Sequence, residues 1–225
     1  MDNTWATPLL FRPLGHGVDY AVQALSKHVV GHSDVLMGVA AVADEARYRR
    51  LRSVARLLGL SVSPEDCALT LRGLDTLAAR LAQSDRSAMR LATWLAVQPE
   101  VERVLHPAQP GHPGQAEWAR DFKGACGVFG VAFRDMPQAA FDAGLDALRL
   151  FRFGASFGGV HSLVAPSSPR GVAGPYVRLS VGLEHPDDLA ADLGNAFTAM
   201  RAALRHGPDR SGGNSAGQYH HTKEA

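Results

Sequence analysis

The segment Ser26-Lys27-His28-Val29-Val30-Gly31-His32-Ser33-Asp34 leads directly into an apolar run from Val35 to Ala43. A polar, glycine-containing turn beside a continuous apolar run is typical of a loop next to a buried strand. Asp44 then opens a stretch, ended by Gly59, whose apolar residues have helical spacing: Tyr48, Leu51, Ala55 and Leu58. This part of the sequence predicts a buried strand followed by a helix.

The next start signal is Ser63-Pro64-Glu65-Asp66, where a capping residue precedes a proline and two acids. It predicts a helix to about Gln83, and a second helix is expected to follow to Val97. The segment 107–114 contains three prolines and two glycines and is expected to be a loop.

From Val101 on, the sequence alternates between strand and helix signals. Strands are expected over 101–106, 127–133 and 176–181. One helix is expected to be capped by Asp135, and the last helix spans 186–206. Their expected core positions are Phe141, Leu145 and Leu148 in the first, and Leu189, Leu193, Phe197, Met200 and Leu204 in the second. The alternation indicates an α/β or α+β class.

Composition narrows the possible functions. The chain has 225 residues, 46% of them hydrophobic, which is enough for one globular domain or two small ones. A formal net charge of +1 gives no overall field that would attract nucleic acid or anionic lipid. The apolar runs are shorter than the roughly 20 residues of a membrane-spanning helix. Cys67 and Cys126 lack metal-ligand spacing, and the first residues carry no export signal, so we expect a cytoplasmic protein.

Primary amines are scarce in this chain. The only lysines are Lys27, Lys123 and Lys223, and the last lies in a Gly-, Ser- and His-rich segment, 207–225, that is expected to be a disordered tail. A lysine between a hydroxyl neighbour and a glycine-containing loop can be desolvated, which makes it a nucleophile toward an aldehyde. A solvated surface lysine fits the same pattern, so the spacing of Lys27 leaves both interpretations open.

Five blocks of the sequence can be compared with known families: Asp2–Pro8, Ser26–Asp34, Leu71–Leu77, Ser156–Leu163 and Arg178–Glu184. In this order they resemble signature segments of the pyridoxal-phosphate-dependent enzymes of cysteine and methionine metabolism. Within this family, the run Asp121–Gly127 and the aromatic Phe157 are most similar to the cystathionine β-lyase branch. The γ-synthases and γ-lyases usually carry an aliphatic residue at the position of Phe157.

The resemblance implies a fold and an assembly. The fold is the C-terminal part of an aspartate-aminotransferase-like (fold type I) α/β protein. Residues 1–70 would be a remnant of the large cofactor domain, and 71–206 the small α+β domain. The family's preceding region has no counterpart in this sequence, so we expect an N-terminally truncated member. Relatives assemble as dimers of dimers, so a homo-oligomer is expected.

The resemblance also assigns roles to individual residues. Lys27 matches the lysine that forms an imine with pyridoxal 5'-phosphate, and Asp2 matches the aspartate that pairs with the pyridine nitrogen. Ser26 matches a hydroxyl that binds the cofactor phosphate. Arg178 matches the arginine that holds the substrate carboxylate, and Ser156 lies beside that carboxylate pocket.

The implied activity is α,β-elimination on L-cystathionine, which yields homocysteine, pyruvate and ammonia. A cystathionine γ-synthase, a γ-lyase and an inactive fragment stay open as alternatives. The sequence departs from the family pattern at His28, which replaces a tyrosine, at His161, which replaces a glutamate, and at Ala24, which lacks a hydroxyl.

Three other functions were weighed from the residues. Gly154–Gly158 fits the G-x-S-x-G pattern of a serine hydrolase, with Glu184 or Asp187 and His206 in the triad order, but its helix-strand context is unfavourable. An arginine-rich helix could bind nucleic acid, although a solvated or subunit-contact face is favoured: Arg47, Arg49, Arg50, Arg52 and Arg56. His28 and His32 with Asp34 could be drawn as a metal site, but no helix is expected there, so no metal is predicted.

Overall fold

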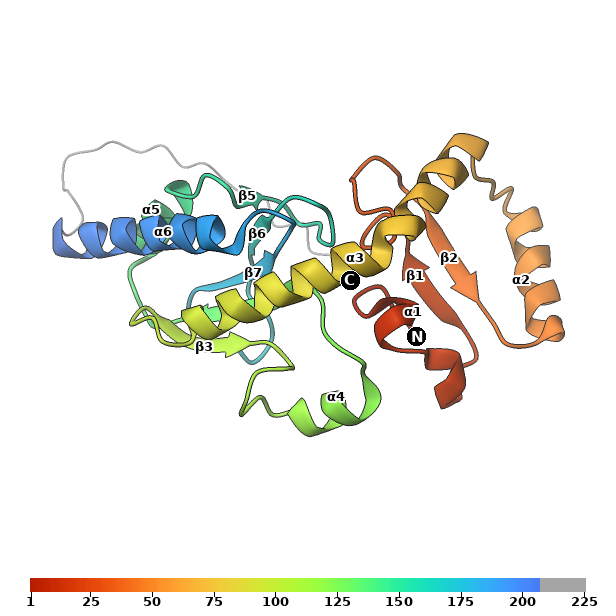
Figure 1. The fold of residues 1–225 in the computed structure, drawn as a ribbon, viewed down its shortest axis with the longest axis horizontal. Helices are drawn as coiled ribbons and strands as arrows, with labels where there is room; N and C mark the ends of the chain where they lie inside the picture. Colours follow the sequence, from red (N-terminus) through yellow and green to blue (C-terminus); the bar gives the residue numbers. More distant parts are fainter. Residues whose placement is uncertain (207–225) are drawn as a thin grey trace.

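The computed structural model describes residues 1–206. Its helices are α1 (Thr7–Leu10), α2 (Glu45–Leu57), α3 (Pro64–Leu95), α4 (Gln115–Asp121), α5 (Gln138–Asp146) and α6 (Pro186–His206), with a 3-10 helix η1 (Pro13–His16). Its strands are β1 (Ala21–Ala24), β2 (Gly38–Ala41), β3 (Val101–Leu105), β4 (Val128–Phe133), β5 (Arg152–Phe153), β6 (Leu163–Pro166) and β7 (Tyr176–Ser180). Figure 1 shows α3 running from the β1–β2 end of the molecule to the end that holds the other strands.

The larger sheet has five strands in the order β3-β4-β7-β6-β5. Its neighbours pair antiparallel except β5 and β6, which are parallel. Every residue of β4, which lies between β3 and β7, is buried, as an apolar strand flanked on both sides should be. This mixed sheet with its helices confirms the predicted α/β class, and the three strands expected in this region are confirmed as β3, β4 and β7.

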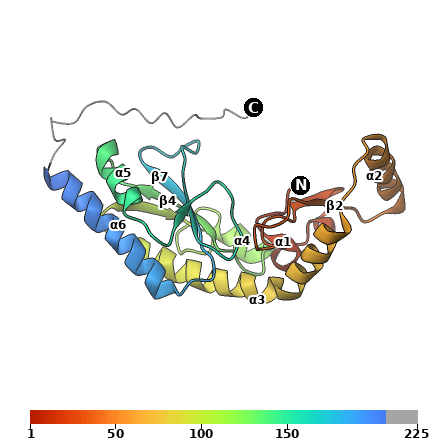
Figure 2. The ribbon, with the colours of Figure 1, turned by 90° about the horizontal axis from the view of Figure 1, so that it is seen from above.

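The core lies between this sheet and the helices. The second half of α3 and α6 lie side by side along it, and α5 packs on α6 (Figure 2). The core includes Leu91 and Leu95 of α3, and Phe197 and Met200 of α6. Leu189 and Leu193 are buried as predicted, but Leu204 is 46% exposed, so its predicted burial was wrong. Leu204 lies in the last turn of α6, and the end of a long helix can extend beyond the sheet and helices on which it packs.

The helix α3 is a single helix of 32 residues. Its start is confirmed, because the Ser63 side chain accepts a hydrogen bond from the Asp66 amide at 3.0 Å. The predicted break after Gln83 was wrong: Ser84 and Ser87 are buried within the helix, and the Ser84 hydroxyl donates to the Leu81 carbonyl at 3.1 Å. A serine that bonds back to the preceding turn continues a helix instead of ending it.

The smaller sheet corrects the prediction for 35–43. Only Gly38–Ala41 forms a strand, and all four of its residues are exposed. This strand pairs antiparallel with β1, and among residues 1–206 no second strand pairs with its other edge. An apolar run indicates that a strand favours burial. The strand is buried only if another part of the protein covers it.

The helix α2 begins where the sequence predicts. The Asp44 carboxylate caps it by accepting from the Arg47 amide at 2.9 Å. The predicted helix is confirmed, but none of its residues is buried: Tyr48 is 47% exposed and Leu58, just beyond its end, 67%. Two of its arginines are paired, Arg47 with aspartates and Arg49 with a glutamate.

The helix α5 differs from its prediction at its start. Its N-cap is Pro137, without a side-chain cap, so Asp135 was wrong as the capping residue. Phe141, Leu145 and Leu148 are buried as predicted, although Leu148 lies just beyond the helix end. The helix α4 and the strands β5 and β6 were not predicted from the sequence.

Within the described residues, no helix combines the length and hydrophobicity that a bilayer span requires. The predicted domain boundary near residue 70 falls inside α3, and the division into two domains stays a prediction. The predicted tail, 207–225, lies outside the described residues.

Candidate functional site

Lys27 lies in a tight turn directly after β1. Its amide donates to the Ala24 carbonyl at 3.3 Å, and the Gly31 amide donates to the Lys27 carbonyl at 2.9 Å. The preceding Ser26 is partly buried, and its amide donates to the Met37 carbonyl at 3.3 Å. The backbone around Lys27 is therefore held by hydrogen bonds on both sides, which leaves the side chain to be oriented by what it contacts.

The Lys27 amine meets a residue that lies 129 positions further along the chain. Its Nζ donates to Ser156 Oγ at 2.9 Å. The same amine lies 5.2 Å from the centre of the Phe157 ring, a distance at which a cation is attracted by the ring face. Ser156 and Phe157 belong to the loop between β5 and β6, so this contact joins the two ends of the molecule.

Arg178, on β7, holds the same loop. Its Nη2 donates to the carbonyls of Ala155 and Ser156 at 2.6 and 2.8 Å, and its guanidinium lies 5.5 Å from the Phe157 ring centre. Its Nε is buried and finds no hydrogen-bond partner among residues 1–206. Burial lowers the pKa of Arg178, because desolvation disfavours the charged form. A partly desolvated guanidinium is suited to bind a carboxylate.

Asp2 lies beside β1 and connects to it. Asp2 pairs with Val22 in an isolated parallel bridge. Its carboxylate accepts from the Thr4 hydroxyl at 2.6 Å and from the Thr4 amide at 2.8 Å, and these bonds lower the pKa of Asp2. Thr4 Oγ1 in turn accepts from the Ala24 amide at 2.9 Å. A chain of hydrogen bonds therefore links the Asp2 carboxylate to the end of β1, three residues before Lys27.

The role of Thr4 as a hydrogen-bond partner of Asp2 was not predicted, although the sequence contains a signal for it. An aspartate two residues before a threonine can accept that residue's amide hydrogen in an Asx turn. Arg80 was missed as well: it donates to the carbonyls of His28 and Val29 at 2.7 and 2.8 Å. No local pattern connects Arg80 to that turn.

His28 is buried against the Ser156–Phe157 loop. Its ring centre lies 5.6 Å from that of Phe157, and its exposure is 4%. Desolvation, with a smaller effect of the Arg80 charge, lowers the pKa of His28 to about 4. His28 therefore acts as a neutral, packed ring in this structure. Its neighbour His32 donates from Nδ1 to the Val30 carbonyl, 2.7 Å away.

Neither the metal-site nor the hydrolase geometry is assembled. Within residues 1–206, no cluster of three His, Cys, Asp or Glu side chains is arranged to hold a metal ion. The hydrogen-bond partner of Ser156 Oγ is the Lys27 amine. Glu184 accepts from the amide and hydroxyl of Ser162, both at 2.8 Å, so its carboxylate is engaged away from Ser156. Asp187 is paired with Arg90.

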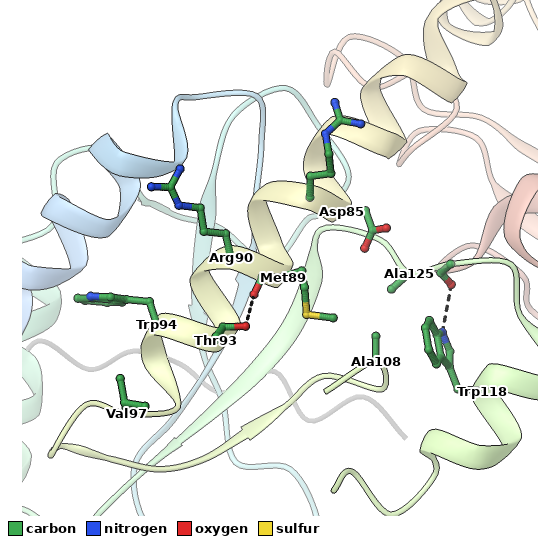
Figure 3. A pocket seen from close by; sticks show the side chains of 11 residues that line it. Asp85, Met89, Arg90, Thr93, Trp94, Val97, Ala108, Trp118 and Ala125 are labelled. Carbon is green, nitrogen blue, oxygen red and sulfur yellow. Dashed lines mark hydrogen bonds between the residues drawn. The ribbon is translucent and has the colours of Figure 1, made fainter. Parts of the chain in front are cut away.

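A separate cavity of about 750 Å³ lies along α3 (Figure 3). Its lining is mostly apolar and includes Met89, Trp94 and Trp118, with the Trp118 indole donating to the Gly124 carbonyl at 3.1 Å. None of the residues that line it belongs to the Lys27 site. The candidate site is therefore defined by its hydrogen bonds and charges, independently of this cavity.

Comparison with known proteins places the chain among relatives. It is 43% identical over 205 residues to a cystathionine beta-lyase of Bordetella avium, which covers 87% of this chain and 52% of the relative. It is 40% identical over 212 residues to a cystathionine beta-lyase of Salmonella typhimurium, which covers 89% of this chain and 53% of the relative. The chain thus spans about half the length of these curated relatives.

The fold is shared as well. A crystal structure of cystathionine gamma synthase from Xanthomonas oryzae pv. oryzae, in complex with aminoacrylate and cysteine, superposes with a TM-score of 0.86 at 35% identity. It covers 90% of this chain and 56% of that chain, which confirms the predicted fold as part of a larger pyridoxal-phosphate-dependent enzyme. The family model described as Cys/Met metabolism PLP-dependent enzyme matches residues 1–198. This chain therefore belongs to the Cys/Met metabolism family of PLP-dependent enzymes.

Proposed function

We propose that the chain carries part of the active site of a carbon-sulfur β-lyase that cleaves L-cystathionine. The bond between the β-carbon and sulfur breaks, and one water is consumed, so the products are homocysteine, pyruvate and ammonia. The observation that carries the proposal is the hydrogen bond between Lys27 Nζ and Ser156 Oγ beside Arg178. It brings a primary amine and a carboxylate-binding cation to one place.

The residues fit pyridoxal phosphate in three respects. The Lys27 amine is only partly buried, so an aldehyde can reach it. The pKa of Asp2 is lowered, so this exposed carboxylate is ionised at neutral pH and suited to pair with a cationic ring nitrogen. Ser26 offers a hydroxyl next to the lysine, suited to a phosphate oxygen. When bound, the cofactor supplies two things: an aldehyde that reacts with amines, and a ring that withdraws electrons.

The chain's own residues divide the remaining work. Arg178 holds the substrate carboxylate through its free donors, which fixes the orientation of the α-carbon. The Lys27 amine takes the proton from the α-carbon and delivers a proton to the leaving sulfur. The Ser156 hydroxyl holds that amine in place. The Phe157 ring, whose centre lies 5.2 Å from the Lys27 amine and 5.5 Å from the Arg178 guanidinium, shields both cations from water.

Covalent trapping tests the assignment of Lys27. The chain is mixed with pyridoxal phosphate, reduced with borohydride, digested, and mapped by mass spectrometry. The reduced label is expected at Lys27, and Lys27→Ala should remove it while Lys123→Ala retains it. Labelling of the exposed Lys123 without Lys27 would exclude the assignment.

The related γ-synthase and γ-lyase activities are the second candidates, since the Xanthomonas structure is of a γ-synthase. The thiol released from L-cystathionine distinguishes elimination at the two carbons. Homocysteine is expected for the proposed β-elimination, and cysteine would indicate γ-elimination.

Our proposal includes a cytoplasmic homo-oligomer, built as a dimer of dimers. The exposed apolar residues at the β1–β2 end support an interface there: Leu36 is 93% exposed and Leu57 is 86% exposed. Light scattering after size exclusion should give four times the mass of one chain. A monomer at every protein concentration tested would contradict the proposal.

A further inference from the structure

We propose that Thr76 and Arg80 of α3, here named the α3 clamp, position Lys27 by holding the backbone of its turn. The inference rests on the proposed role of Lys27. Neither residue contacts the Lys27 amine, so both are positioning residues. The block Leu71–Leu77, which contains Thr76, resembles a family signature but has no role in the chemistry described above.

The turn that carries Lys27 resembles one turn of helix. The Val30 amide donates to the Leu25 carbonyl at 2.9 Å, and the Gly31 amide donates to the Lys27 carbonyl at 2.9 Å. The next carbonyls, of His28 and Val29, receive their hydrogen bonds from Arg80, at 2.7 and 2.8 Å. The arginine thus caps the open end of the turn, where carbonyls lack intrahelical donors.

Every nitrogen of the Arg80 guanidinium is used. Nη1 bonds His28 and Nη2 bonds Val29, while Nη2 also donates to the Gly73 carbonyl at 2.7 Å. Nε donates to Thr76 Oγ1 at 2.9 Å, which fixes the plane of the group. Because the donors form a rigid planar fork, these bonds fix the position of the turn relative to α3.

The space for the guanidinium depends on a missing side chain. Gly31 has a φ of 74°, and a Cβ built there would lie 2.0 Å from Arg80 Nη1. The glycine therefore serves both the left-handed backbone and the close approach of the arginine. Close approach of the helix itself is allowed by Gly73, where a Cβ would lie 2.4 Å from the Val29 carbonyl oxygen.

Holding this turn fixes the direction of the Lys27 side chain. The carbonyls that Arg80 binds belong to the two residues directly after Lys27, and the first of them, His28, packs on Phe157. Without the clamp the turn can shift relative to the Ser156–Phe157 loop. The 2.9 Å contact between Lys27 Nζ and Ser156 Oγ would then be populated less.

Hydrogen exchange measured by mass spectrometry tests the clamp without the cofactor. In Arg80→Met, exchange over 25–31 is expected to be about ten- to hundredfold faster, because the hydrogen bonds to a charged donor are lost. The matched control is Arg86→Met on the same helix, since the exposed Arg86 donates to Gln83 of α3 and not to the 25–31 segment, and it should leave that segment unchanged. Thr76→Val should give a smaller acceleration in the same segment, and it serves if Arg80→Met does not fold.

Borohydride trapping adds a second measurement. The ratio of label at Lys27 to label at Lys123 within one sample is expected to fall in Arg80→Met and to recover in part in Arg80→Lys. Unchanged exchange over 25–31 in folded Arg80→Met, or acceleration spread evenly over the chain, would overturn the clamp. If the parent chain carries no label at Lys27, the proposed function fails, while the exchange data still decide the clamp.

Discussion

Gly158 offers a sharp test of how the Ser156–Phe157 loop is packed on the Lys27 turn. It has a φ of 78°, and a Cβ built there would lie 2.8 Å from both the backbone nitrogen and Nδ1 of His28. Real Cβ atoms essentially never come this close to a backbone atom, so Gly158→Ala forces the two loops apart. Gly17 is the matched control, because its φ is 81° and nothing lies within 4 Å of its Cβ position.

The size of the effect follows from two costs. In both variants, an alanine in a left-handed backbone lowers the free energy of unfolding by about 1–2 kcal/mol. In Gly158→Ala alone, overpacking against His28 lowers it by about 1–3 kcal/mol more. The contact is expensive to relieve, since Arg80 binds the His28 carbonyl and the side chain is 4% exposed. Gly158→Ala is therefore expected to destabilise the chain by about 2–5 kcal/mol and Gly17→Ala by about 1–2 kcal/mol.

Urea unfolding followed by far-UV circular dichroism measures both variants against the parent chain. Equal losses of unfolding free energy in the two variants would refute the argument, because the contact with His28 would then cost nothing. The Gly158 variant should in addition lose borohydride-trapped label at Lys27, since Ser156 moves with the loop, while the Gly17 variant retains it.

Three further predictions follow from burial and charge. Burial lowers the pKa of His28 and His106 to about 4. Below pH 6.5 the unfolded chain therefore binds protons that the folded chain does not, and the free energy of unfolding should fall toward pH 4 by up to about 3 kcal/mol per histidine. In urea titrations at several pH values, the variant that combines His28→Gln and His106→Gln should show a weaker dependence of this free energy on pH. An unchanged dependence would contradict the prediction. Burial raises the pKa of the Cys126 thiol, so Ellman's reagent should modify the partly exposed Cys67 alone in the native chain, and two rapid equivalents would disprove this. If Arg178 holds the substrate carboxylate, Arg178→Lys should raise KM for L-cystathionine about tenfold or more, because the planar fork is lost, and an unchanged KM would exclude that role.

Local patterns in the sequence predicted the local structure well. Ser63 and Asp44 cap their helices through hydrogen bonds that a short window of sequence already contains. The alternation of apolar residues predicted β7, and the helical spacing of Leu189, Leu193 and Phe197 predicted the buried face of α6. Cys126 lies within an apolar run of the sequence and is fully buried.

The same patterns failed where a partner surface decides the outcome. The apolar run 35–43 predicted a buried strand, but the strand covers only 38–41 and all four of its residues are exposed. Periodicity encodes which face of an element favours burial. It does not encode whether another element covers that face, because covering depends on residues far away in the chain.

The candidate site divides along the same line. The sequence by itself determined that Lys27 is one of two lysines before residue 207, and that residues 1–198 match a family of PLP-dependent enzymes. Only the tertiary structure decided that Lys27 meets Ser156 and that Arg80 holds the turn that carries Lys27. These contacts join residues 129 and 52 positions apart, and they form because α3 carries both ends of the molecule. No short-range pattern contains that geometry, since it is the path of the whole chain that brings the groups together.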